Sequence, residues 1–257
     1  NSIIALIVKY ACHPVTTGPT SLGPDYPGFM RDFLEKTYPS STAMFIQGCA
    51  GDTRIQIIND DATKFLDKSS IGDLRLDAEN EKNIFLQAAK RFGRDLGLSA
   101  QWALQKKGTP ITGPLKATIK TIKLPLEKYS IETIKKKRQS KVQPSWKKYI
   151  DNWADNFIKK IKAGEKLPTD YDFMIQAVTF GQNTKTPFIF IGLQGEMTTE
   201  YGQKIAEKLT PANSIIAAYC NVRRTYIPTA EILAKGGYEA DAPLIGDFLP
   251  AKFAPEI

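Results

Sequence analysis

The sequence predicts an α/β fold, built on a mixed sheet flanked by helices and carrying a Lys-rich helical insertion. Short apolar runs of strand length alternate with longer segments of helical periodicity, which is the pattern of α/β proteins. The run over residues 2–11 is almost continuously apolar, as expected for a strand buried on both faces. Residues 128–166 hold twelve basic and four acidic side chains, so this segment alone accounts for the formal charge of +8.

The first half of the chain is expected to contain two strands and two helices. A Pro- and Gly-rich loop follows the first strand and leads to a helix over about 27–36. The apolar run 43–47 predicts the second strand. Apolar positions at helical spacing after an aspartate N-cap predict a long helix over 77–106. Gly93 and Gly97 are expected to interrupt or bend that helix.

The second half is expected to place strands and helices on either side of the basic segment. Thr and Lys alternate with Ile over 116–124, which predicts a half-exposed strand. Two helices over 130–141 and 145–163, separated at Pro144, are expected to form the basic segment. The further predicted elements are strands over 173–180 and 188–192 joined as a hairpin, a helix over 198–209, a strand over 214–219 and a short helix over 229–234.

We interpret residues 1–257 as a single domain with a helical basic segment over 128–166. An apolar strand at the N-terminus is unusual, because chain ends are commonly polar and loose. We therefore expect the chain to begin inside a fold and to lack its N-terminal portion. No apolar run approaches the roughly 18 residues that cross a bilayer.

The single histidine, His13, excludes several classes of metal site. The His-Glu-x-x-His zinc helix, paired-histidine zinc fingers and carbonic-anhydrase-like sites each need at least two histidines from the chain. Three cysteines are too few for a disulfide scaffold, and their apolar neighbours favour burial as small hydrophobic side chains.

Polar residues follow four of the predicted strands. His13 and Asp52 follow the first two strands, and Glu196 and Tyr226 follow two strands in the second half. Ligand sites gather at the carboxyl ends of strands in open α/β sheets, and imidazole, carboxylate and phenol are donors that suit zinc. Each residue also has an ordinary structural role, as a rim histidine, a turn or cap aspartate, a glutamate at a helix N-terminus and a packed tyrosine.

Six short motifs occur in a fixed order over most of the chain. They are Tyr10-Ala-Cys-His-Pro-Val-Thr-Thr-Gly-Pro19, Asp25-Tyr-Pro-Gly28, Phe45-Ile-Gln-Gly-Cys-Ala-Gly-Asp52, Gly195-Glu-Met-Thr-Thr-Glu-Tyr-Gly202, Tyr226-Ile-Pro-Thr229 and Gly236-Gly-Tyr-Glu239. In this order they resemble the neutral/alkaline (non-lysosomal) ceramidase family. The resemblance implies the C-terminal part of a zinc-dependent amidase domain, which hydrolyses the N-acyl bond of ceramide or a related lipid amide.

The resemblance also implies roles for single residues. His13 matches the family's second zinc-binding histidine, Glu196 its zinc-binding glutamate and Tyr226 its zinc-binding tyrosine. Zn²⁺ is accordingly the expected cofactor, and a small molecule or lipid is the expected substrate. Relatives are commonly secreted or periplasmic, so the same location is expected here.

Two departures from the family pattern shape the expected site. The family's first zinc histidine lies upstream, so we expect a missing N-terminal segment to supply a further zinc ligand. The family places a serine two residues after Asp52, whereas this chain has Arg54 there, beside Thr53. Arginine cannot act as a nucleophile but can stabilise an oxyanion. The candidate catalytic residues are therefore Asp52, Thr53, Arg54 and Tyr226.

Other interpretations stay open at this point. The chain could be a non-catalytic relative that binds a lipid, glycan or anionic ligand in the same cleft. Arg54, Arg223 and Arg224 could form an anion-binding rim or simply be surface residues. The basic helices could dock on a membrane surface or present an ordinary solvated face. We do not expect nucleic acid as a partner, because Lys outnumbers Arg eleven to one in the basic segment.

Overall fold

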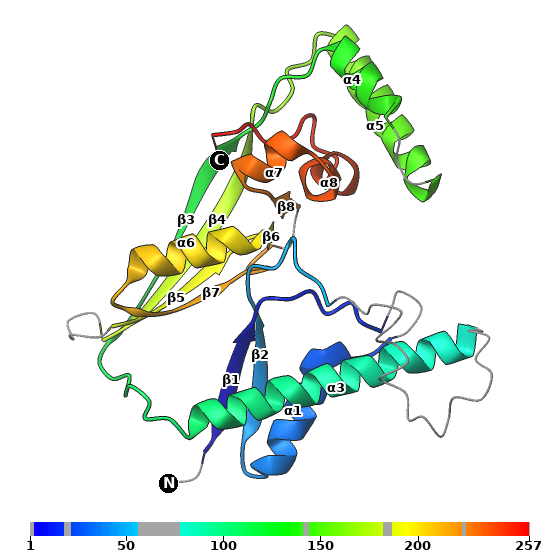
Figure 1. Ribbon diagram of the computed structural model, residues 1–257. Helices are drawn as coiled ribbons and strands as arrows, with labels where there is room; N and C mark the ends of the chain where they lie inside the picture. Colours follow the sequence, from blue (N-terminus) through cyan, green and yellow to red (C-terminus); the bar gives the residue numbers. More distant parts are fainter. Residues whose placement is uncertain are drawn as a thin grey trace. The chain divides into compact units, whose positions relative to one another are not determined.

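The chain combines helices with parallel and antiparallel strands, which confirms the predicted α/β class (Figure 1). The computed structural model describes residues 3–17, 22–55, 78–140, 144–181, 187–222 and 225–256. Contacts divide the chain into two compact units. Unit 1 comprises Asn1–Gly48 and Thr53–Pro110, and unit 2 comprises Cys49–Asp52 and Ile111–Ile257. The expectation of a single domain stays a prediction.

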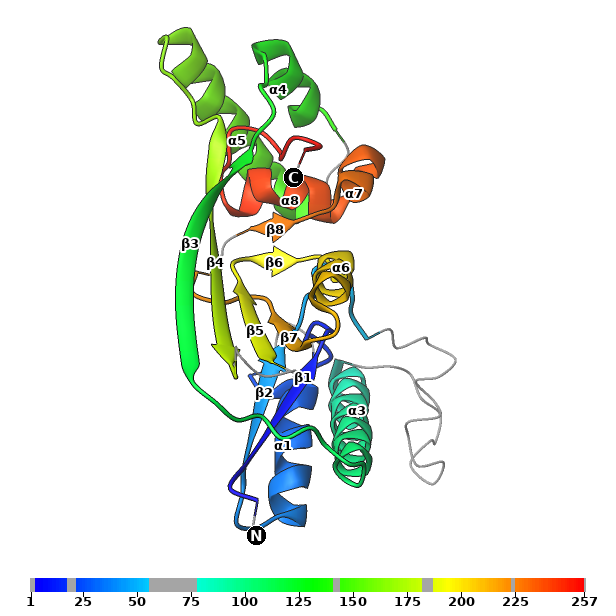
Figure 2. The ribbon, with the colours of Figure 1, turned by 90° about the vertical axis from the view of Figure 1, so that its left-hand side faces the viewer.

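Unit 1 is a pair of parallel strands packed on two helices (Figure 2). The strands are β1 (Ala5–Tyr10) and β2 (Thr42–Gln47), and the helices are α1 (Asp25–Thr37) and α3 (Ala78–Leu104). The two helices and the inward-facing strand residues share one apolar cluster. Its fully buried members are Leu6, Met30, Leu34 and Ala43.

The first strand is not buried on both faces, so that prediction was wrong. Leu6 points into the cluster, whereas Ile7 is 56% exposed and Met44 on β2 is 41% exposed. The helices of unit 1 cover one face of the pair, and alternate residues of a strand point to opposite faces. In this apolar strand, residues that point toward the helices are buried, and residues on the opposite face are exposed although they too are apolar.

The expected interruption of the long helix at Gly93 and Gly97 is not found. α3 continues through Gly93 and Gly97, and these glycines serve its packing on α1. A Cβ atom at Gly93 would lie 2.6 Å from the backbone oxygen of Tyr26, and one at Gly97 would lie 2.5 Å from the ring of Phe33. The missing side chains allow the two helices to approach closely.

Unit 2 is built on a four-stranded mixed sheet with the order β3-β4-β5-β7. β3 (Leu115–Pro125), β4 (Asp170–Phe180) and β5 (Phe188–Leu193) are antiparallel, which confirms the predicted hairpin. β7 (Asn213–Ala217) runs parallel to β5, and α6 (Thr199–Leu209) forms the crossover between them. These strands and the helix lie within four residues of their predicted boundaries.

A second, very short parallel pair lies beyond this sheet. β6 (Glu196–Met197) pairs with β8 (Tyr226–Ile227), and both are visible side by side in Figure 2. α7 (Ala230–Lys235) and α8 (Tyr238–Gly246) follow β8. The short helix was predicted, whereas the two-residue strands and α8 were not.

The basic segment forms two helices, as predicted, and these pack together as a helical hairpin. It consists of α4 (Ile131–Arg138) and α5 (Pro144–Lys162), with Pro144 in the first turn of the second helix. The apolar sides of both helices enclose a core with Leu244 of α8, and Trp153 is fully buried there. None of the helices in the described ranges is both long and apolar enough to span a membrane.

Candidate functional site

A buried carboxylate, Glu196, lies at the centre of the candidate site. Gly195 turns the chain after β5 with a positive φ of 75°, which glycine adopts at little cost, and Glu196 follows it on β6. The Glu196 amide donates to the carbonyl oxygen of Thr225 at 2.9 Å, and the Tyr219 amide donates to that of Gly195 at 2.9 Å. These bonds attach the turn after β5 to the segment after β7, and only 4% of Glu196 is exposed.

Tyrosine hydroxyls surround the Glu196 carboxylate. Glu196 and Tyr226 are register partners in the β6–β8 pair, so their side chains share one face. The Tyr226 hydroxyl hydrogen-bonds to the carboxylate, and the Tyr219 hydroxyl donates to Oε2 of Glu196 at 3.1 Å. The ring of Tyr238 packs edge-on against Tyr226, with centroids 5.4 Å apart. Paired hydroxyl donors make it possible to bury this carboxylate.

The environment of Tyr226 keeps its phenol protonated. Burial raises the pKa of Tyr226 well above its ordinary value near 10, and the adjacent Glu196 carboxylate raises that pKa further. Tyr226 is therefore a neutral hydrogen-bond donor to Glu196 at physiological pH. A bound dication would favour the opposite, deprotonated form, because metal ions dominate the local electrostatics of their sites.

The segment that carries the tyrosines contains three residues in the left-handed region. Tyr219, Asn221 and Thr225 have φ values of 59°, 61° and 46°. This conformation is costly for side chains with a Cβ atom, and above all for a β-branched threonine. The strain is held by the backbone bonds of this segment to Gly195 and Glu196. Strained backbone of this kind concentrates at binding and catalytic sites.

Asp52 lies in the same unit as Glu196 and caps a helix. Its Oδ1 accepts hydrogen bonds from the amide and the hydroxyl of Thr199, each at 2.7 Å, at the start of α6. The preceding Gly51 donates to Met197 at 2.8 Å, and a Cβ atom there would lie 2.7 Å from the carbonyl oxygen of Glu196. The Gly51-Asp52 turn thus fixes the ends of β6 and α6.

His13, Thr53 and Arg54 belong to unit 1. The His13 amide donates to the carbonyl oxygen of Thr53 at 2.9 Å, and Nδ1 of His13 lies 3.1 Å from the same oxygen. Because a carbonyl oxygen only accepts, Nδ1 carries the hydrogen, and Nε2 is the acceptor atom of the neutral ring. Metal-binding histidines are commonly oriented by such a bond. Arg54 is exposed, and its backbone pairs with that of His13 in a single parallel β-bridge.

The structure therefore gathers some of the expected residues and places others separately. Glu196 and Tyr226 are in direct contact, and Asp52 is fixed beside the strand that carries Glu196. Arg223 and Arg224, the other candidates for an anion-binding rim, lie outside the described residues. Tyr219 and Tyr238 were missed. Tyr219 was predicted to be the last residue of a strand, but β7 ends at Ala217, so Tyr219 lies just beyond its carboxyl end. Ligand sites gather at that position in α/β sheets, so a correct strand boundary would have marked Tyr219 as a candidate.

The donor types fit zinc. A carboxylate and a phenol oxygen in unit 2, and an oriented imidazole in unit 1, are nitrogen and oxygen donors of the kind that zinc binds. Over the described ranges, no three His, Cys, Asp or Glu side chains come together to hold a metal ion. The phenol of Tyr226 is the oxygen donor in contact with Glu196, so it is the candidate second ligand at this position.

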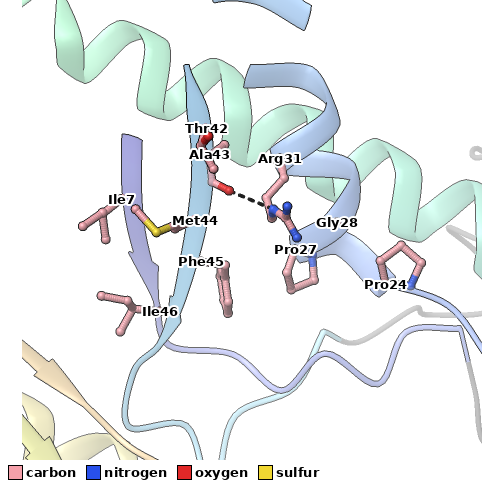
Figure 3. Close-up of a pocket in the computed structure, with 10 residues that line it drawn as sticks. All are labelled: Ile7, Pro24, Pro27, Gly28, Arg31, Thr42, Ala43, Met44, Phe45 and Ile46. Carbon is pink, nitrogen blue, oxygen red and sulfur yellow. Dashed lines mark hydrogen bonds between the residues drawn. The ribbon is translucent and has the colours of Figure 1, made fainter. Parts of the chain in front are cut away.

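Unit 1 contains a separate groove beside β2 (Figure 3). It encloses about 630 Å³ between the free edge of the strand and the first turns of α1. The Arg31 side chain donates to the carbonyl oxygen of Ala43 at 2.8 Å, and Glu35 accepts from the Ala43 amide at 2.9 Å. Among the described residues that line the groove, Arg31 is the one ionisable side chain, and its guanidinium lies 3.9 Å from the Glu35 carboxylate.

Searches of protein-family models, of curated proteins and of solved structures found no match to this chain. The resemblance to the ceramidase family stays a prediction, carried by the six motifs.

Proposed function

We propose that this chain forms part of a zinc-dependent hydrolase of the neutral ceramidase-like family, which cleaves an amide bond in a lipid-like or related substrate. The observation that carries the proposal is the buried Glu196 carboxylate with the Tyr226 and Tyr219 hydroxyls directed at it. Such a group is costly to bury and is held by strained backbone, a combination typical of functional sites.

In this proposal Glu196 and Tyr226, which are in contact within unit 2, would hold the metal, and His13 is added as a ligand on the family resemblance alone. When bound, zinc supplies Lewis acidity, which polarises an amide carbonyl and lowers the pKa of a water molecule. The chain's own residues prepare the ligands. Tyr219 fixes one oxygen of Glu196, the Thr53 carbonyl oxygen fixes the ring of His13, and Tyr238 supports the ring of Tyr226.

The remaining candidates have supporting roles in this proposal. Asp52 holds the N-terminus of α6 and, through the adjacent Gly51, the strand that carries Glu196. Thr53 acts through its backbone carbonyl on His13. Arg54 is an exposed guanidinium that can stabilise an oxyanion, and no nucleophile is assigned to its position.

Zinc titration of the purified chain by calorimetry tests the proposal. We expect one Zn²⁺ per chain, and we expect Glu196→Gln to weaken binding by at least about 100-fold because it removes a charged ligand. Glu200→Gln is the matched control, since Glu200 is a neighbouring glutamate that pairs on the surface with Lys204. The proposal fails if Glu196→Gln and Glu200→Gln bind zinc as tightly as the parent chain.

A second candidate function is a non-catalytic relative that binds a lipid, glycan or anionic ligand. The observation that favours it is the hydrogen bonding of Glu196 by two tyrosine hydroxyls, which satisfies the buried carboxylate without a metal. Ligand binding that survives both His13→Ala and Glu196→Ala would support this candidate over the hydrolase.

A further inference from the structure

The α4–α5 hairpin presents lysines on its outer surface because its apolar side is already used. Ile134, Ile150, Trp153 and Phe157 are buried against one another and against Leu244. The indole nitrogen of Trp153 donates to the carbonyl oxygen of Leu249 at 2.7 Å, which anchors the core to the C-terminal segment. Among the described residues of the hairpin, the large apolar side chains of α5 are thus largely turned inward, and the exposed side chains include many lysines.

Four exposed lysines, which we call the basic stripe, lie along one side of the hairpin. Lys148, Lys159 and Lys162 are separated by eleven and three residues on α5, which places them on one helical face. Arg138 on α4 reaches this face, because its guanidinium contacts Asp155 at 2.7 Å. Lys135 lies one turn before Arg138 on α4 and completes the stripe.

The lysines of the basic stripe keep their charge because the carboxylates beside them pair with other basic side chains. Asp151 pairs with Arg138 and Lys147, and Asp155 pairs with Arg138. Within the described part of the chain, no ion pair involves a lysine of the stripe. Glu132 interacts electrostatically with Lys135, so the stripe offers a net positive charge of about three to a negatively charged surface.

We infer that the basic stripe docks on an anionic lipid bilayer. Lysine is a flexible point charge that suits a diffuse array of headgroups, whereas base and phosphate readers depend on the arginine fork. Tyr149 follows Lys148 in the sequence, about 100° around α5 from it, and has 59% of its surface exposed; tyrosine favours the membrane–water interface. Figure 1 shows the hairpin extending from one end of the unit 2 sheet.

The choice of a bilayer over nucleic acid rests on the aromatic residues. Binding of single strands combines a basic groove with several rings on which successive bases stack. Here Trp153 and Phe157 are buried, and Trp146 packs on Tyr238 with centroids 5.3 Å apart. Tyr149 is thus the one strongly exposed aromatic ring among the described residues of the hairpin.

Co-sedimentation of the full chain with vesicles tests the inference. The vesicles contain phosphatidylcholine alone or with about 30% phosphatidylserine, at about 50 mM and about 500 mM salt. We expect binding to the anionic vesicles at low salt, and loss of binding at high salt or with phosphatidylcholine alone. Each lysine near such a surface favours binding by about fivefold. Replacing Lys135, Lys148, Lys159 and Lys162 together by Gln should therefore weaken binding by at least about tenfold.

A matched variant distinguishes the effect of the stripe's lysines from the effect of lowering the net charge of the chain. It replaces Lys107, Lys116, Lys120 and Lys208, which are exposed lysines outside the hairpin, and should retain binding within about threefold. Circular dichroism and thermal melting verify that both variants fold. Three results would each overturn the inference: no binding to anionic vesicles, equal losses in the two variants, or tighter stripe-dependent binding to a DNA oligonucleotide than to vesicles. The inference does not depend on zinc or on hydrolysis.

Discussion

Unit 2 holds two charged regions that handle charge in opposite ways. The Glu196 cluster buries one carboxylate and directs tyrosine hydroxyls at it from Tyr219 and Tyr226. The α4–α5 hairpin exposes many lysines to solvent, and among its described residues Lys137 and Lys147 form ion pairs with carboxylates. A buried, oriented charge can hold a metal or a reacting group, whereas an exposed array gives affinity without fixed geometry. The two regions differ in solvent exposure: Glu196 is buried, as in a candidate centre, whereas the lysines of the hairpin are exposed, as in a docking surface.

The largest effect on stability is expected in the core beneath the basic hairpin. Trp153→Ala removes a fully buried ring and should lower the free energy of unfolding by about 3–5 kcal/mol, because it leaves a cavity and an unpaired Leu249 carbonyl. The matched control is Trp102→Ala, since Trp102 is 61% exposed and should cost less than about 1 kcal/mol. Denaturant unfolding measures both, and equal losses would refute the assignment of a core to the hairpin.

A smaller effect is expected from a single hydroxyl in each of the two regions. Tyr219→Phe removes a donor to buried Glu196 and should lower the free energy of unfolding by about 1–3 kcal/mol. Tyr149→Phe removes a hydroxyl from an exposed ring of the hairpin and should change it by less than about 0.5 kcal/mol. The comparison is made by unfolding in denaturant with a chelator present. If the two variants were indistinguishable, the Glu196 cluster would have no special dependence on its hydroxyls.

An effect of similar size is expected at alkaline pH, where the partly buried phenol of Tyr201 makes the stability of the folded protein depend on pH. Burial raises the pKa of Tyr201 to about 12, while an unfolded tyrosine titrates near 10. The folded state then retains a proton that the unfolded state has lost, so stability falls between pH 10 and about 12. Tyr201→Phe should make this fall shallower than in the parent chain. Thermal melting across that pH range measures it, and identical slopes would contradict the shift.

The regular elements were predictable because their signals are local. Apolar periodicity located α6, the β4–β5 hairpin and both basic helices to within a few residues. Gly93 and Gly97 were misjudged because helix propensity says nothing of a neighbouring helix. The pairing of β6 with β8 was not predictable, since two-residue strands carry no periodicity and are defined by long-range backbone bonds.

The residues at the centre of the candidate site were named from the sequence, whereas the residues that support them were not. Glu196 and Tyr226 were found because they follow apolar strands and match the ceramidase-like motifs. Tyr219 could not be identified from the sequence, because its place at Glu196 depends on where β7 ends and on its left-handed backbone conformation, which is rare for residues other than glycine. Asp52 shows the converse, because its ordinary role as a helix cap explains the contacts of its side chain.

The alternative ligands for zinc in this chain are its cysteines, and they define the most direct test. Burial raises the pKa of the Cys12 and Cys220 thiols, which disfavours the thiolate that binds metals. X-ray absorption at the zinc edge of the zinc-loaded chain should show nitrogen and oxygen neighbours at about 2.0–2.2 Å, and this shell should be lost in Glu196→Gln. A sulfur shell at about 2.3 Å, or an unchanged spectrum in Glu196→Gln, would contradict a zinc centre at Glu196 and Tyr226.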